Sequence, residues 1–135
     1  MITLIDTNVV LDVAGNDPIW ADWSRLQINH SAQRGTIAIN SIVYAELSVF
    51  YDRTDDVDEV LAESGILLEE IPRPALFLAG KAFQAYRKRG GTRTGVLPDF
   101  FIGAHASSSG FPLLTRDTRR YRTYFPDVTL ITPHP

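Results

Sequence analysis

Four acidic side chains in this 135-residue sequence are candidates for chemistry, because each stands within or directly after an apolar stretch. Asp6 and Asp117 each follow a short apolar run. Glu46 is the only charged side chain from 36 to 50, and Asp99 is similarly isolated in its own segment. A carboxylate in apolar surroundings costs free energy unless a partner meets it.

If the four carboxylates met, they would repel one another, and a divalent cation would remove that repulsion. The sequence contains no cysteine and only three histidines, so carboxylate oxygens would have to hold a metal here. Oxygen ligands favour Mg²⁺ or Mn²⁺. One or two such ions activate water and stabilise a leaving oxygen, which suits the hydrolysis of phosphodiester bonds.

Each acid taken singly also has an ordinary structural explanation. Asp6 and Asp117 could cap helices that begin beside them, and Asp99 could stabilise the positive end of its helix. Glu46 could form a buried ion pair with an arginine distant in sequence. The order of the surrounding elements therefore decides whether the four act together.

Predicted strands alternate with predicted helices along the whole chain, which indicates an α/β fold whose parallel sheet is covered by helices on both faces. The acids follow or closely follow strands, and ligands of such sheets bind beyond the carboxyl ends of the strands. The pattern thus predicts that all four converge at one edge, with Ser41 capping the helix of Glu46. Strands are predicted at 1–5, 36–40, 66–71, 112–115 and 128–132, and helices at 9–14, 17–32, 42–51, 54–64, 74–89, 98–108 and 117–124.

Length and composition indicate one globular domain over 1–135, with 44% apolar and 21% charged residues. The run from 100 to 115 is too short and too polar to span a membrane. The N-terminus lacks the basic start of a signal peptide, so the expected location is the cytoplasm.

The net charge of −3 hides an asymmetry between the two halves of the chain. Residues 1–80 carry four basic and thirteen acidic side chains, whereas residues 81–135 carry nine basic and three acidic ones. A local basic surface can bind phosphate even on an acidic protein, although solvated helix faces can also differ in charge by chance.

Four segments of the sequence resemble the PIN-domain family and, within it, the VapC toxins of bacterial and archaeal toxin–antitoxin pairs. The resemblance covers nearly the whole chain, and the motifs occur in the order that the family has. The segments are Leu4-Ile-Asp6-Thr-Asn8, Tyr44-Ala-Glu46-Leu47, Pro98-Asp99-Phe-Phe-Ile-Gly-Ala-His105-Ala and Leu114-Thr-Arg-Asp117-Thr-Arg-Arg-Tyr-Arg-Thr-Tyr-Phe-Pro126.

The resemblance implies a three-layer α/β/α sandwich and a ribonuclease that requires Mg²⁺ or Mn²⁺. It also implies cleavage of single-stranded or loop RNA that leaves a 5′-phosphate and a 3′-hydroxyl, a VapB-type antitoxin partner and a homodimer. The family's four catalytic, metal-binding acids correspond to Asp6, Glu46, Asp99 and Asp117, and none is replaced.

Residues beside the acids are candidates for supporting roles. Thr7, Asn8 and Thr115 could orient water or phosphate, or could form ordinary turn hydrogen bonds. Arg116 and Arg119 are candidates for phosphate contacts with RNA, the alternative being ion pairs with the acidic half. The basic segment 87–93 could clamp RNA, although such runs are more often solvated loops.

Four further residues are expected to be structural. Trp20 and Trp23 could stack on bases, but their helical spacing favours packing or a dimer contact. His105 lies in an apolar helix and is expected to be a satisfied helix residue rather than a base. Asp12 is expected to lie at a helix end without binding metal.

Other classes of protein fit less well. A signalling receiver needs a late lysine that is missing here, and a haloacid-dehalogenase-type phosphatase needs an aspartate where Asn8 stands. The principal alternative is a non-catalytic module that binds RNA or protein on the same fold. A DNA nuclease is disfavoured because the chain lacks extra elements that would grip duplex DNA.

Overall fold

A five-stranded sheet forms the centre of the molecule in the computed structural model, which describes residues 1–93 and 95–134. All the strand pairings are parallel, and the order across the sheet is β3-β2-β1-β4-β5. The first strand lies in the middle, so β1 pairs with β2 on one side and with β4 on the other. The strands are β1 (Ile2–Ile5), β2 (Thr36–Ile39), β3 (Leu67–Leu68), β4 (Leu113–Leu114) and β5 (Leu130–Ile131).

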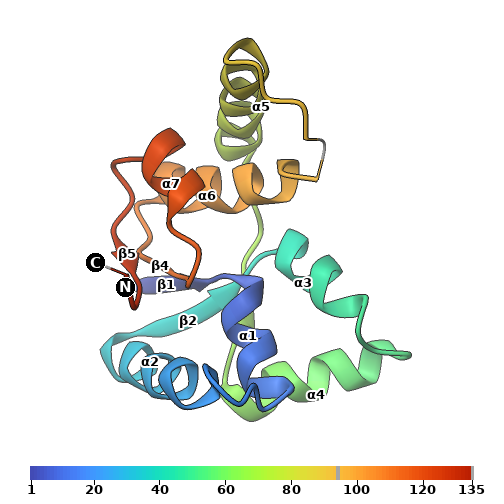
Figure 1. Cartoon of the computed structure of the whole chain (residues 1–135). Coiled ribbons are helices and arrows are strands. Elements are labelled where there is room, and N and C mark those ends of the chain that lie inside the picture. The colour runs from blue at the N-terminus through green and yellow to red at the C-terminus, as the bar shows by residue number, and fades with distance from the viewer. Residues whose placement is uncertain (94, 135) are drawn as a thin grey trace.

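Helices cover both faces of the sheet, which confirms the predicted α/β/α arrangement (Figure 1). In the view of Figure 1, α1, α2 and α4 lie below the sheet, and α5, α6 and α7 lie above it. The helices are α1 (Thr7–Ala14), α2 (Ala21–Arg34), α3 (Ser41–Ser48), α4 (Thr54–Ser64), α5 (Arg73–Lys88), α6 (Leu97–Ser109) and α7 (Arg119–Tyr124).

The core is built on the three central strands, whose side chains are buried on both faces. Leu4, Ile5, Ile39 and Leu113 are completely inaccessible to solvent, as expected for strands that helices cover on two sides. Helix α6 is buried along most of its length and packs above the sheet (Figure 1). The carboxyl ends of the central strands are therefore held rigidly.

Several predicted element boundaries need correction. The largest shift is that of α2, which begins at Ala21 instead of residue 17, and α3 ends at Ser48 instead of residue 51. Strands β3, β4 and β5 are shorter than predicted, and α1 begins at Thr7 instead of residue 9. The cap of α3 is Asn40 rather than Ser41, because the Asn40 Oδ1 atom accepts hydrogen bonds from the backbone N–H groups of Ile42 and Val43. Helix α7 begins after the position of Asp117, so this residue does not cap it.

Within the described residues, no helix is both long enough and apolar enough to cross a membrane.

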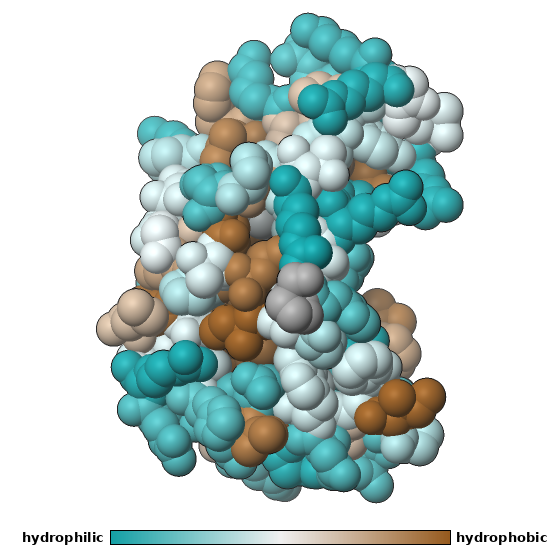
Figure 2. Space-filling view, turned by 60° about the vertical axis from the view of Figure 1, so that its left-hand side comes forward, coloured by the Kyte–Doolittle hydropathy of each residue, from teal (hydrophilic) through white to brown (hydrophobic). Residues whose placement is uncertain are grey.

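The surface is hollowed at mid-height on the right-hand side of Figure 2, and hydrophilic side chains gather above the hollow.

Candidate functional site

Asp6 is the central carboxylate of the site and stands at the point where β1 passes into α1. It is 4% exposed. Its Oδ1 atom accepts a hydrogen bond from the backbone N–H of Thr7 at 2.8 Å, so Asp6 is also the cap of α1. Its Oδ2 atom accepts from Thr115 Oγ1 at 2.8 Å, from Tyr121 OH at 2.9 Å and from Asn8 Nδ2 at 3.4 Å.

The hydrogen-bond donors around Asp6 determine which of its two carboxylate oxygens can bind a further ligand. Burial raises the pKa of Asp6, and the Glu46 carboxylate raises it further, whereas the hydrogen bonds from Thr115 and Tyr121 lower it. Three donors point to Oδ2 and one to Oδ1. Since a carboxylate has about four acceptor positions, two on each oxygen, Oδ1 is the atom with capacity for one more ligand.

Glu46 projects from α3 and is half-buried. Its Oε1 atom accepts a hydrogen bond from the Thr7 hydroxyl at 2.6 Å. Thr7 therefore contacts both acids, Asp6 through its backbone and Glu46 through its side chain. No ion pair of Glu46 occurs among the described residues, so the alternative of a buried pair with a distant arginine finds no support there.

Asp99 lies in the first turn of α6, and its side chain is 26% exposed. Burial raises its pKa to about 6, and the charges of Asp6 and Asp117 contribute to the increase. The guanidinium of Arg120 pairs with Asp99 Oδ2 and partly offsets these effects. The interaction with two other acids shows that the carboxylates from three separate segments lie close enough to influence one another.

Asp117 is the most exposed of the four acids and lies between β4 and α7. Its backbone N–H donates to Thr115 Oγ1 at 3.0 Å, and the same hydroxyl lies 3.1 Å from its carbonyl oxygen. Thr115 thus links the turn that carries Asp117 to the buried Asp6. Hydrogen bonds thus link Asp6 to Glu46 through Thr7 and to the turn of Asp117 through Thr115, and the charge of Asp6 acts on Asp99. The joint role of the four acids in metal binding stays a prediction.

The donor set suits a hard divalent cation, because it consists of carboxylate oxygens. Burial raises the pKa of Asp6 and of Asp99, and the charges of neighbouring carboxylates add to the increase. In the part of the chain that the structure describes, no three acidic or histidine side chains lie close enough together to hold one metal ion. The Arg120 guanidinium supplies the positive charge at Asp99 instead. A metal that bound Asp99 would replace that contact.

The two arginines predicted to contact RNA have different surroundings. Arg116 makes two hydrogen bonds with Asp12, from Nε at 2.7 Å and from Nη2 at 2.9 Å, and its guanidinium lies 5.0 Å from the centre of the Trp20 ring. This is the ion-pair alternative, and it also explains why Asp12 is buried. Arg119 is exposed beside Asp117.

The remaining aromatic and histidine predictions concern packing. Trp20 packs edge-on against Trp23, with ring centres 6.1 Å apart. His105 is 1% exposed, and its Nδ1 atom lies 3.2 Å from Asn40 Nδ2. Because Asn40 Oδ1 already accepts two backbone N–H groups, its amide nitrogen faces His105, whose Nδ1 is then the acceptor. Burial lowers the pKa of His105, in keeping with a neutral structural residue. The expectation of a satisfied histidine is only half right, because Nε2 is buried without a hydrogen-bond partner among the described residues.

Sequence reasoning did not identify Tyr121 or Arg120 as site residues. Tyr121 is 1% exposed and, with Phe125 four residues later, forms the buried face of α7. This helical spacing is visible in the sequence and predicts burial, but it does not reveal that the hydroxyl reaches Asp6. Arg120 is one of four arginines in a short segment, and only the fold distinguishes it.

Fold and site together define a parallel-sheet protein with a cluster of acidic residues at the carboxyl edge of its central strands. Residues 3–126 match the family model of the PIN domain. The chain belongs to the PIN-domain family.

Solved structures with the same fold include several VapBC assemblies. The chain resembles one from VapBC2 of Rickettsia felis, a complex bound to a fragment of its promoter DNA, with 22% identity, a TM-score of 0.75 and 98% of each chain covered. It also resembles one from VapBC-1 of nontypeable Haemophilus influenzae, with 18% identity, a TM-score of 0.72 and 98% of each chain covered. FitAcB of Neisseria gonorrhoeae gives 19% identity, a TM-score of 0.68 and full coverage of both chains. Among curated proteins, none matches the sequence significantly.

Proposed function

We propose that this chain is a metal-dependent endoribonuclease, the VapC-type toxin of a VapBC-type toxin–antitoxin pair. The observation that carries the proposal is the hydrogen-bond network around Asp6 on a PIN-domain fold, in which Thr7 links Asp6 to Glu46 and Thr115 links Asp6 to the turn of Asp117. Its substrate is RNA, its partner is a VapB-type antitoxin, its assembly is a homodimer, and its location is the cytoplasm. Structural relatives that were solved as VapBC complexes support the antitoxin partner.

Asp6, Glu46, Asp99 and Asp117 would hold Mg²⁺ or Mn²⁺. The ion would supply activation of water and stabilisation of the leaving oxygen. The chain's own residues prepare this site: Thr115 and Tyr121 hold one oxygen of Asp6 and leave the other available. Such outer contacts orient the ligands of a metal and tune its affinity.

The proposal is tested by incubating the purified full chain with total cellular RNA in Mg²⁺, in Mn²⁺ and in a chelator. We expect discrete cuts that require metal and disappear in Asp6→Asn and Asp99→Asn variants shown to be folded by circular dichroism. Asp22→Asn is the matched control, because the Asp22 side chain is fully exposed on α2. Cleavage that persists in the chelator, or in both site variants, would contradict the proposal.

One observation favours a second candidate, a non-catalytic module that binds RNA or protein. Arg120 pairs with Asp99, so this carboxylate has one cationic partner within the protein itself. In that case calorimetry would detect no Mn²⁺ binding, and RNA would remain intact with every metal. Metal binding together with metal-dependent cleavage would exclude this candidate.

A further inference from the structure

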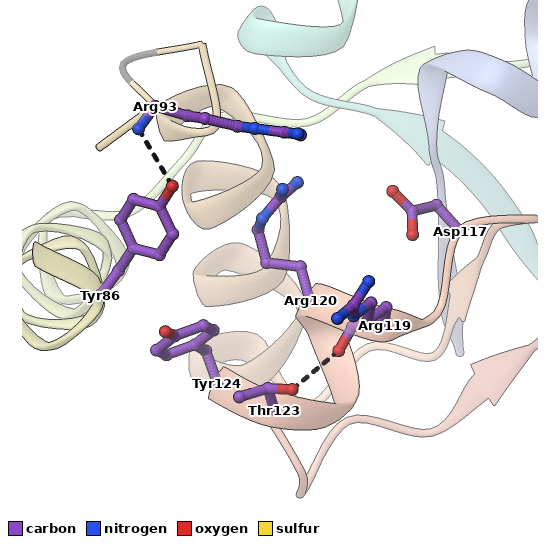
Figure 3. Close-up of a pocket in the computed structure, with 7 residues that line it drawn as sticks. All are labelled: Tyr86, Arg93, Asp117, Arg119, Arg120, Thr123 and Tyr124. Carbon is purple, nitrogen blue, oxygen red and sulfur yellow. Dashed lines mark hydrogen bonds between the residues drawn. The ribbon is translucent and has the colours of Figure 1, made fainter. Parts of the chain in front are cut away.

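A pocket of about 570 Å³ opens beside Asp117. Its volume lies within the range of about 300–1,000 Å³ that small-molecule sites occupy. Two tyrosines and three arginines from α5, the segment after it, and α7 form most of its wall. Figure 3 shows the rings of Tyr86 and Tyr124 on one side, Asp117 on the other, and Arg93 and Arg120 reaching between them.

The pocket carries an excess of positive charge. Among the described residues, neither Arg93 nor Arg119 has a carboxylate within ion-pairing distance, in contrast to Arg116, which Asp12 holds in two hydrogen bonds. Two arginines without an ion-pair partner beside aromatic rings are suited to a phosphate group and to the flat face of a base.

The side chain of Tyr86 holds the backbone of Arg93 in place. The backbone N–H of Arg93 donates to Tyr86 OH at 3.1 Å. Gly91 lies against the same ring, so closely that an added Cβ atom would be 2.4 Å from the ring carbons Cε2 and Cζ. Tyr86 thus anchors the chain from Gly91 to Arg93 and directs the Arg93 side chain over the pocket.

The pocket and the carboxylate site share residues. Asp117 lines the pocket, and Arg120 lines it while pairing with Asp99. A polymer bound at Asp117 would therefore also contact the pocket that Asp117 lines.

We propose that this pocket binds one nucleotide of single-stranded RNA next to the cleaved linkage, with Arg93 and Arg119 on its phosphate and Tyr86 or Tyr124 against its base. This inference rests on the proposed ribonuclease function and assigns a subsite to it. Arg89 lies over the Tyr124 ring at 5.4 Å and Phe83 stacks on the Tyr86 ring, so a base would meet the exposed edges of these tyrosines. An acidic peptide would satisfy the arginines but would leave these aromatic edges unused, so the observations favour RNA.

The test measures binding without cleavage, so that it is independent of catalysis. A fluorescent single-stranded RNA of about twelve nucleotides, long enough for a typical single-strand site, is titrated with the full chain in a chelator at several salt concentrations. We expect Arg93→Gln and Arg119→Gln each to weaken binding about tenfold and to reduce the slope of log affinity against log salt by about 0.7. Tyr86→Phe, which keeps the ring but loses the anchor of Arg93, should weaken binding less than Arg93→Gln.

The matched control is Arg25→Gln, which removes the same charge from an exposed position on α2 and should leave binding unchanged. A poly-glutamate peptide of equal charge is titrated in parallel. Equal losses of RNA affinity in all three arginine variants would contradict nucleotide binding in the pocket. Unchanged affinity in the Arg93 and Arg119 variants would contradict it as well. If the peptide binds as tightly as RNA and depends on the same arginines, the assignment to RNA is wrong. Because no cleavage is measured, an inactive protein that still shows the expected losses would refute the nuclease and retain the subsite.

Discussion

Asp99 carries a charge that the metal-free protein stabilises poorly, and this has a consequence for stability. Its pKa in the folded state is about 6, above the ordinary value of 3.8, so the folded protein binds more protons than the unfolded chain between these values. Its contribution to stability therefore falls as pH rises from about 4 to about 6, by an amount on the order of 2–3 kcal/mol. In chelator, we expect Asp99→Asn to become more stable than wild type as pH rises through this window.

Urea unfolding at several pH values measures this effect. Asp22→Asn, at a fully exposed position, should follow the wild-type pH dependence. If Asp99→Asn also has that same pH dependence, the raised pKa of Asp99 is wrong.

Tyr121 is a positioning residue for Asp6, because its buried hydroxyl is one of the donors that leave Asp6 Oδ1 available. We expect Tyr121→Phe to lower the affinity for Mn²⁺ by roughly tenfold, the smaller end of the effects seen for outer contacts of metal ligands. Isothermal titration calorimetry measures this affinity directly. Tyr44→Phe is the control, since Tyr44 donates to Asp58 at the surface. Equal affinities in wild type and Tyr121→Phe would show that the contact has no such role.

At the scale of the elements, the sequence predicted the alternation of strands and helices and the positions of Asp6 and Asp117 after the neighbouring strands β1 and β4. The apolar runs before Asp6 and Asp117 carried that prediction, because a buried parallel strand must be apolar on both faces. Local sequence did not predict that Arg116 pairs with Asp12, a contact across 104 residues. The preference of Asn40 over Ser41 as a cap also depends on a distant group, since the Asn40 amide meets His105.

Two helical glycines give opposite predictions for the same substitution. A Cβ atom at Gly103 on α6 would lie 2.4 Å from the Phe125 ring, so Gly103→Ala should destabilise the protein by about 1–3 kcal/mol. At Gly80 on α5 no atom lies within 4 Å, so Gly80→Ala should stabilise it by roughly 0.5–1 kcal/mol through helix propensity. Urea unfolding of both variants tests the packing of α6 on the segment after α7. Similar effects at the two positions would contradict that packing.

At the scale of the whole molecule, the proposed homodimer needs an apolar surface, and exposed apolar side chains are candidates for it. Phe77 on α5 is 68% exposed and adjoins the partly exposed Leu76. Large apolar side chains that stay exposed together often mark an interface. We therefore expect Phe77→Asp to shift the protein toward monomer, because a carboxylate in an apolar interface loses its hydration without gaining a partner.

Ile19→Asp introduces the same charge at a side chain that is 78% exposed before α2, and it should leave the assembly unchanged. Sedimentation equilibrium across a range of concentrations distinguishes the outcomes. A monomeric wild type would exclude the homodimer, and a dimer that survives Phe77→Asp would place the interface away from this face of α5. In either of these two cases, the antitoxin becomes the partner to test next on Phe77, by repeating the measurement with the complex.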